Sequence, residues 1–170
     1  MREHINLFEQ QNEEIHEFCK KYKIYDYTVT PEGVDVQGKV KIKDRSLHKL
    51  PFQFNVIHGD FNIEYSGLQT LENTPRVVHG YFDCSNNELQ SLHDIPKFIK
   101  GVLYCELNNI EPWEYRYLLF SEIQGRIYTN PVELIKLFKL YQNQKSLIPQ
   151  ALKELREIQI QWEQMNARTY

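Results

Sequence analysis

Apolar residues recur with a fixed period between residues 38 and 109 of the chain. Four glycines, Gly38, Gly59, Gly80 and Gly101, are separated by 21 residues each, and apolar side chains follow every one of them at the same offsets. A fixed period in this range indicates a solenoid, in which each repeat forms one turn and stacks on the turn before it. The sequence therefore predicts a core built from columns of equivalent residues.

Two apolar columns lie directly after the glycines. They hold Val40, Phe61, Phe82 and Leu103 at the second position after the glycine, and Ile42, Ile63, Cys84 and Cys105 at the fourth. Their alternation with polar residues predicts a short strand in each repeat, with both side chains facing inward. Other apolar columns end each repeat with the pairs Val56 and Ile57, Val77 and Val78, and Phe98 and Ile99. Each glycine therefore marks a bend between two strand-like segments, where a positive φ would favour a residue without a Cβ.

The residues before the repeats predict a helix and a hairpin. Residues 3–23 contain neither Gly nor Pro, and their apolar residues, Ile5, Phe8, Ile15, Phe18 and Cys19, recur at helical spacing. We expect this helix to cap the exposed end of the solenoid, and a separate partner-binding helix is the alternative. Residues 24–37 alternate around the turn Pro31-Glu32-Gly33. They predict a degenerate first half-repeat that closes the edge of the sheet.

Residues 111–170 leave the repeat and carry three helical patterns. The first runs from Pro112 to a stop at Gly125, and the second begins at Asn130-Pro131, with Asn130 as the expected N-cap and a buried stripe from Val132 to Tyr141. Ser146 and Pro149 open the third. We expect these helices to cover the C-terminal end of the sheet. The predicted organisation is a capping helix over residues 1–23, a solenoid over 24–110 and a helical region over 111–170.

The segment FDCSNNELQSL resembles the core pattern of leucine-rich repeats. Its pattern positions are filled by Phe82, Cys84, Asn87, Leu89 and Leu92, and Asn108 repeats the Asn position, whereas Arg45 and Ser66 depart from it. The short repeat looks most like the bacterial and tailed-phage variety, and small phage-encoded leucine-rich-repeat proteins with a helical tail are similar. The resemblance implies an α+β fold, a short leucine-rich-repeat solenoid with helices at both ends. It also implies that Asn satisfies backbone groups and that the concave strand face binds a partner.

Composition narrows the cellular setting and the classes of partner. The net charge is −3, from 20 basic and 23 acidic residues, and 41% of the residues are hydrophobic. This balance gives no global attraction to nucleic acid or to a bilayer. The first residues are charged, and no apolar run approaches the roughly 20 residues that span a membrane. We expect a cytoplasmic protein, in the host cytoplasm if it is phage-encoded.

Three small groups of residues have a chemical and a structural interpretation. His58 and His79 share a column and lie near Asp60, so a metal site is one interpretation and turn residues the favoured one. Cys84 and Cys105 are either a redox pair or, as we expect, two buried apolar side chains. The aromatic segment from Trp113 to Phe120 fits nucleic-acid stacking or, with only Arg116 as a cation, a core helix. With no catalytic motif present, we expect no enzyme activity, cofactor or metal.

Outward strand positions form the candidate site. They lie one, three and five residues after each glycine and are Lys39, Lys41 and Lys43, then Asp60, Asn62 and Glu64, then Tyr81, Asp83 and Ser85, and finally Val102, Tyr104 and Glu106. The predicted partner-binding residues among them are Lys39, Lys41, Asp60, Asn62, Glu64, Tyr81, Asp83, Tyr104 and Glu106. The alternative is a solvated face with cross-strand Lys–Asp pairs.

The function expected from these features is that of a non-enzymatic protein-interaction module. Combined with the resemblance, this implies a phage-encoded protein that binds and modulates a bacterial host or defence protein through the concave strand face. The alternative is that the C-terminal helical region is the effector or self-association unit, through Trp162 and its neighbours, with the solenoid as its platform.

Overall fold

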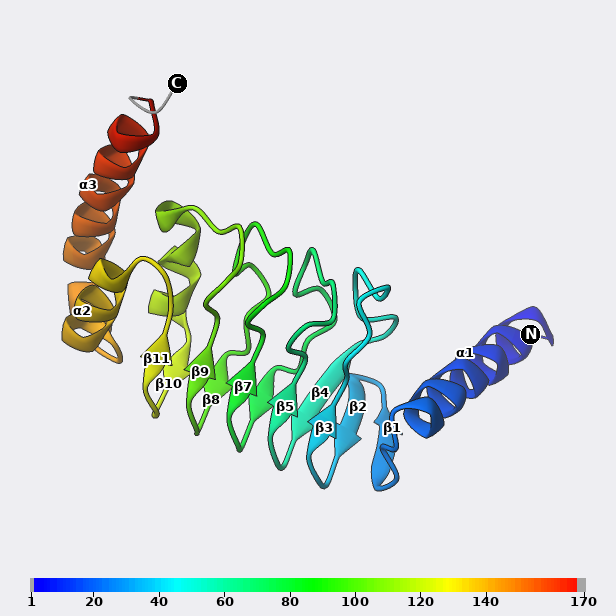
Figure 1. Cartoon of the computed structure of the whole chain (residues 1–170). Helices are drawn as coiled ribbons and strands as arrows, with labels where there is room; N and C mark the ends of the chain where they lie inside the picture. Colours follow the sequence, from blue (N-terminus) through cyan, green and yellow to red (C-terminus); the bar gives the residue numbers. More distant parts are fainter. Residues whose placement is uncertain (1, 168–170) are drawn as a thin grey trace.

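The computed structural model is a β-solenoid of about five turns, with a helix at its N-terminal end and helices at its C-terminal end (Figure 1). It describes the backbone of residues 2–167 and the side chains of residues 9–131 and 133–167. The predicted side-chain roles of Ile5, Phe8 and Val132 lie outside these described residues. The predicted α+β solenoid with a repeat of about 21 residues is confirmed.

Each turn contributes one strand to each of two sheets. The six-stranded sheet contains β1 (Tyr27–Thr30), β2 (Gly33–Val36), β4 (Phe54–Ile57), β6 (Val77–Val78), β8 (Phe98–Ile99) and β10 (Glu122–Ile123), in that order. The five-stranded sheet contains β3 (Val40–Lys41), β5 (Phe61–Asn62), β7 (Phe82–Asp83), β9 (Leu103–Tyr104) and β11 (Ile127–Tyr128). All neighbouring strands are parallel except β1 and β2, which form an antiparallel hairpin. The strand predicted after each glycine is therefore present.

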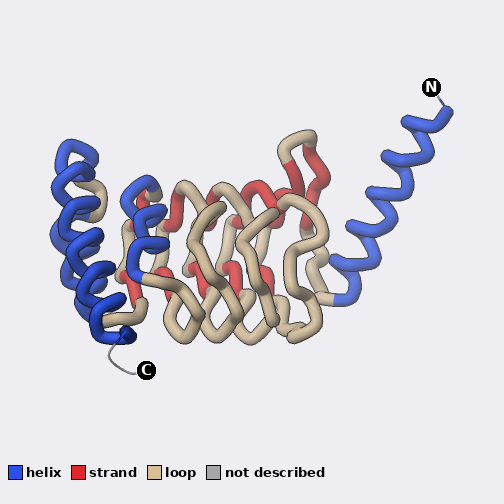
Figure 2. The backbone as a smooth tube through the Cα atoms, turned by 90° about the horizontal axis from the view of Figure 1, so that it is seen from above, coloured by secondary structure: helices blue, strands red, loops and turns tan. Residues whose placement is uncertain are grey.

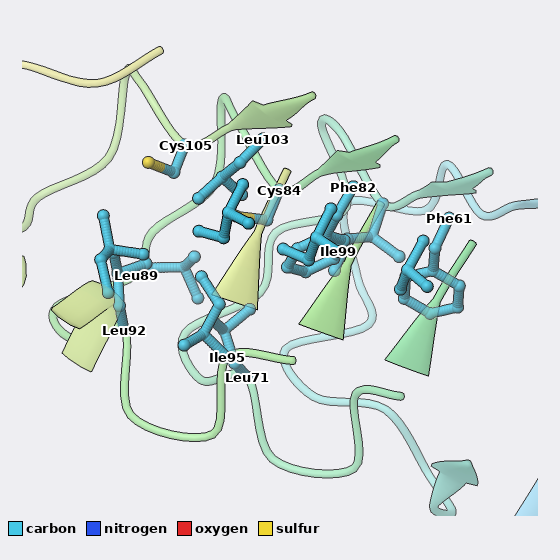
Figure 3. Packing of buried hydrophobic residues seen from close by; sticks show 14 of the residues in the cluster. Phe61, Leu71, Phe82, Cys84, Leu89, Leu92, Ile95, Ile99, Leu103 and Cys105 are labelled. Atoms are coloured by element: carbon cyan, nitrogen blue, oxygen red, sulfur yellow. The ribbon is translucent and has the colours of Figure 1, made fainter. Parts of the chain in front are cut away.

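The core fills the space between the two sheets. Register places Phe61 beside Val40 on one side and beside Phe82 on the other, and Leu103 continues the same column. These side chains are buried, and Figure 3 shows Phe61, Phe82 and Leu103 stacked from turn to turn. Of the apolar pair that ends each repeat, only the second residue is buried, because successive side chains of a strand point to opposite faces.

Close contact between turns, and not a positive φ, explains the glycines at positions 59, 80 and 101. The N–H of Gly101 donates to the carbonyl of Gly80 at 2.9 Å, and Gly80 donates to Gly59 at the same distance. A Cβ built on Gly101 would lie 2.6 Å from the carbonyl carbon and oxygen of Gly80. The glycines with positive φ are instead Gly33 and Gly67. The expectation that a positive φ favours glycine at these bends is therefore wrong.

The solenoid continues beyond residue 110, where the sequence-based division ended it. The segment predicted to form a helix before Gly125 forms the 3₁₀ helix η1 (Pro112–Phe120), and β10 and β11 follow on either side of Gly125. Gly125 does not end a helix, because its N–H donates to the carbonyl of Gly101 at 3.1 Å and continues the glycine column. The spacing between these two glycines is 24 residues, since η1 lengthens the connection. The 21-residue period therefore does not reveal the fifth turn, because the connection before it is longer than in the other turns.

Helices α2 (Val132–Tyr141) and α3 (Ile148–Ala167) stand at the C-terminal end of the solenoid, with the short 3₁₀ helix η2 (Lys145–Leu147) between them (Figure 1). Both α-helices were predicted, but the residue at the N-cap of α2 is Pro131 and makes no side-chain cap, so the assignment of Asn130 as the cap is wrong. The buried Gln159 of α3 accepts a hydrogen bond from the N–H of Trp113 at 2.9 Å. This bond fastens α3 to η1.

Helix α1 (Arg2–Lys21) is attached to the solenoid near its C-terminal end. Ile15 and Cys19 are buried there, and the Phe18 ring lies 5.1 Å from that of Phe52. The N-terminal part of α1 points away from the solenoid (Figures 1 and 2). Among the described side chains of α1, those of its last turns therefore cap the solenoid.

A single carboxylate ties the end of α1 to the first turn of the solenoid. Asp44 accepts hydrogen bonds from the Lys21 ammonium at 2.8 Å and from the Tyr22 hydroxyl at 2.7 Å. The bond from Lys21, with further bonds from Ser46 and Tyr22, holds the pKa of Asp44 well below its usual range, and Asp44 in turn raises the pKa of Lys21. A carboxyl with a lowered pKa stabilises the folded contact above its ordinary pKa, and the contribution is lost as the pH falls through the folded value. A lysine with a raised pKa contributes below its ordinary pKa and loses its effect as the pH rises.

Replacing Asp44 by Asn is expected to loosen α1 and to expose Cys19. The Cys19 thiol is fully buried, and burial raises its pKa to about 11, so reaction with a thiol reagent reports opening of this contact. We expect labelling at neutral pH to be up to about tenfold faster in Asp44→Asn. Asp26→Asn is the control, since Asp26 makes no ion pair among the described residues. Equal labelling of all three proteins would show that Asp44 does not hold the helix.

Candidate partner-binding face

The structure brings the nine predicted partner-binding residues together on the outer side of the five-stranded sheet. Register aligns Lys41, Asn62, Asp83 and Tyr104 in one row across the strands. Residues one and three positions after each glycine therefore occupy one continuous surface. We call the outward side chains of β3, β5, β7, β9 and β11, with those that directly follow these strands, the strand face.

One end of the strand face is basic. Lys39, Lys41 and Lys43 are exposed on and beside β3, the first strand of this sheet. The ammonium of Lys43 lies 4.9 Å from the centre of the Tyr65 ring. None of these lysines forms an ion pair within the described part of the chain. Their charge is therefore available to a partner.

The middle of the strand face is acidic and internally hydrogen-bonded. Asp83 accepts bonds from the N–H and hydroxyl of Ser85, at 3.1 and 2.6 Å, and from the Asn62 amide at 3.4 Å. Asp60 accepts a bond from the N–H of Tyr81 at 3.0 Å, and Glu64 accepts one from the Asn86 amide at 3.3 Å. These donors carry no charge. Within the described residues, no lysine of the strand face forms an ion pair with Asp60, Glu64 or Asp83, so the cross-strand Lys–Asp pairs of the alternative interpretation are absent and the negative charge of this region is not neutralised.

The other end of the strand face is a cluster of tyrosine rings. The centres of Tyr81 and Tyr104 are 6.2 Å apart in an edge-on arrangement, and Tyr104 and Tyr128 stack at 5.1 Å with an angle of 7° between their planes. Tyr128 remains 37% exposed. A hollow of about 660 Å³ adjoins it, lined by Gly125, Arg126, Ile127, Tyr128, Ile135, Phe138, Lys139 and Gln142. The tyrosines thus lead from the sheet to the first C-terminal helix.

Tyr128 is the functional candidate that sequence reasoning missed. It lies three residues after Gly125, and Tyr104 lies three residues after Gly101. This shared offset was the signal that could have found it. The signal was hidden because Gly125 was interpreted as the end of a helix.

The two histidines lie at turns and the two cysteines are buried core residues. The rings of His58 and His79 stack at 5.3 Å, but both are exposed, and Asp60 bonds to Tyr81 on the other side of the bend. Cys84 and Cys105 are free, fully buried thiols, and burial raises the pKa of Cys105 to about 12. A buried, protonated thiol is a poor nucleophile, so these cysteines act as small core residues.

The aromatic segment before β10 belongs mainly to the core, as predicted. Tyr115, Leu118 and Leu119 are buried, and the Arg116 guanidinium stacks on the ring of Tyr117 at 4.4 Å. Phe120 is the exception, with 55% of its surface exposed.

Neither a search of the described residues for metal and membrane features nor a comparison with known proteins identifies the chain. No group of three or more His, Cys, Asp and Glu side chains in the described part of the chain is arranged to hold a metal ion. None of the helices within residues 2–167 combines the length and apolar character needed to cross a bilayer. Compared with protein-family models, curated proteins and solved structures, the chain matches none of them. The functional argument therefore rests on the chemistry of the strand face.

Proposed function

We propose that this protein is a non-enzymatic binding module whose strand face docks a protein partner. The observation that carries the proposal is the row formed by a lysine end, an acidic middle and a tyrosine cluster on one surface of the five-stranded sheet. Tyrosine side chains dominate binding energy at many protein interfaces because they bury a large area at a small entropic cost. The three regions together define an oriented surface for a partner.

Rigidity supports the proposal. Both neighbours of β7 pair with it in parallel register, and the Asp83 carboxylate is fixed by Ser85 and Asn62. Tyr81, Tyr104 and Tyr128 restrain one another through ring contacts. A surface that is already ordered loses little conformational entropy when a partner binds.

The charges of the strand face define the charge distribution expected on the partner. Its surface should carry acidic groups opposite Lys39 and Lys41, and basic groups opposite Asp60 and Asp83. Because the two charged regions lie at different positions along the sheet, a partner bound in the reverse orientation would place like charges together. The tyrosine cluster would then receive an apolar or cationic side chain of the partner.

Glu106 adds an energetic reason to assign a binding role to this surface. Its Oε2 atom is buried and has no hydrogen-bond partner within the described residues. An unsatisfied buried acceptor costs stability, and such groups recur at sites that are selected for function. A donor from a partner would compensate for this cost after a small side-chain movement.

The expected partner is a bacterial host or defence protein, a choice that rests on the resemblance to phage-encoded repeat proteins alone.

Changing Tyr81, Asp83 and Tyr104 together to alanine is expected to weaken binding of the partner by at least about a hundredfold. The partner is first captured from bacterial lysate with the wild-type protein, identified by mass spectrometry and purified for titration. A second variant, Tyr104→Ala with Tyr128→Ala, leaves the Asp83 hydrogen bonds in place. Circular dichroism of both variants should match that of the wild type.

The matched control is the opposite side of the solenoid. Val77, His79 and Lys100 lie on the outer side of the six-stranded sheet, and their joint replacement by alanine should leave binding unchanged. Full binding by both strand-face variants, with loss of binding in the control, would place the partner on the other sheet and contradict the proposal.

A further inference from the structure

The edge strand of the six-stranded sheet at the N-terminal end has no charged residue, and of its side chains Tyr27 contacts α1 through a hydrogen bond with His16 at 2.8 Å. β1 is the last strand there and pairs only with β2 (Figure 1). Gln37 donates to the carbonyl of Asp26 at 2.9 Å, and Thr28 pairs with Asp35 in the same register. Since alternate residues of an antiparallel strand face its partner, Tyr27 and Val29 direct their N–H and C=O groups away from β2. No hydrogen bond reaches these groups from the described residues.

Two of the other three sheet edges, those of β10 and β3, are protected. At the C-terminal end of the same sheet, the side-chain amides of Gln142 and Asn143 both donate to the carbonyl of Ile123 in β10. At the N-terminal end of the five-stranded sheet, the edge strand β3 is flanked and occupied by exposed Lys39, Lys41 and Lys43. Lysines on an edge strand oppose pairing with another chain, and capped carbonyls do the same. Of the three edges of β1, β3 and β10, only that of β1, with the sequence YTVT, combines free backbone groups with strongly strand-forming, uncharged residues in the described part of the chain.

We infer that β1 is a self-association edge and that two copies of this chain pair through antiparallel β1 strands. A second copy of the chain can pair here because a two-fold axis at Thr28 places Tyr27 of each copy opposite Val29 of the other. The backbone N–H and C=O groups of these two residues then form hydrogen bonds between the copies. The six-stranded sheets of the two copies then join into one continuous sheet across the dimer. The same pairing covers Val29, which is 39% exposed in the single chain.

Charge at the ends of β1 favours the antiparallel arrangement. Glu32 follows the strand and Lys23 precedes it, and both are exposed. Antiparallel pairing brings the Glu32 end of one copy to the Lys23 end of the other, whereas parallel pairing would place like charges together. The strand itself has no charge to repel its copy. Helix α1 runs outward from this end (Figure 2).

The inference is tested by the oligomeric state of the intact chain over a wide range of concentration. Sedimentation velocity should show a monomer–dimer equilibrium. Val29→Pro removes an N–H that points away from β2, so the hairpin keeps its own hydrogen bonds. Because of the two-fold axis each dimer loses two bonds, and the dissociation constant should rise roughly thirtyfold. Ile160→Lys is the control, since Ile160 is 44% exposed at the opposite end of the molecule.

A cross-link gives a second measurement that does not depend on affinity. In the inferred pairing, Thr28 faces Thr28 of the other copy as a non-hydrogen-bonded pair, with Cα atoms about 4.5 Å apart. Thr28→Cys should therefore form a disulfide-linked dimer on mild oxidation. Tyr25→Cys should not, because residue 25 does not face itself. A protein that stays monomeric at all concentrations and gives no Thr28→Cys dimer, or a dimer dissociated by Ile160→Lys and not by Val29→Pro, overturns the inference.

Discussion

Replacing Gly101 by alanine is expected to lower the free energy of unfolding by about 3 kcal/mol, whereas replacing Gly38 is expected to leave it unchanged or to raise it slightly. The two positions are equivalent in the repeat. A Cβ on Gly101 would lie 2.6 Å from two atoms of Gly80 and 2.7 Å from the N atom of Tyr81, all of them backbone atoms. A Cβ on Gly38 would meet nothing within 4 Å.

The size of the effect follows from where the contact lies. The Gly101 N–H bonds to Gly80, and the strands on either side of the bend pair with the previous turn. Making room for a methyl group therefore means separating two turns in both sheets at once. At Gly38 no such neighbour exists, and alanine reduces the entropy of the unfolded chain, because the φ of Gly38 is not positive. Urea denaturation of both variants measures the difference, and equal stabilities would show that the turns can separate freely.

The position of this glycine column was predictable from the sequence, but its physical cause was not. A period reports that equivalent residues occupy equivalent environments, so the inward columns through Phe61 and Phe82 could be predicted as core. The period does not report whether glycine is needed for its φ or for the absence of a Cβ. That distinction depends on the distance between successive turns, which is a property of the stacked structure.

Two other features show the limits of a pattern. The fifth turn was missed because η1 lengthens one connection and fills it with apolar residues that also suit a helix. Tyr128 was lost from the candidate site for that reason. Helix α1 was predicted correctly, but helical periodicity is the same whether a face is covered or projects from the molecule. The offsets from each glycine did place the strand-face residues. The bonds from Ser85 to Asp83 depend on side-chain geometry that no offset contains.

The second large effect is expected at Asn87, whose replacement by alanine should lower the free energy of unfolding by about 4 kcal/mol. The Asn87 side chain is buried and bonds two consecutive turns together. Its amide nitrogen donates to the carbonyls of Ile63, Cys84 and Ser85, at 2.9 to 3.1 Å. Its oxygen accepts from the N–H groups of Ser66 and Leu68, both fully buried, at 2.9 and 3.1 Å. Alanine would leave both N–H groups without a partner.

Asn108 is the matched control for Asn87, because it occupies the same repeat position in the next turn but is only partly buried. Its oxygen accepts one backbone bond, from Leu89 at 3.2 Å, so Asn108→Ala should cost about 1–2 kcal/mol.

The variant Asn87→Asp has a side chain of the same shape and separates the donor role of the Asn87 amide from its acceptor role. The new carboxyl keeps the bonds from Ser66 and Leu68 but faces carbonyl oxygens, so its pKa should rise above the usual range. The folded state then binds the proton more tightly than the unfolded state, and the stability deficit of Asn87→Asp should shrink as the pH falls through this raised pKa. Denaturation at neutral and acidic pH measures that change, and a deficit that grows on acidification would show that the donor bonds of Asn87 are not what holds these turns together.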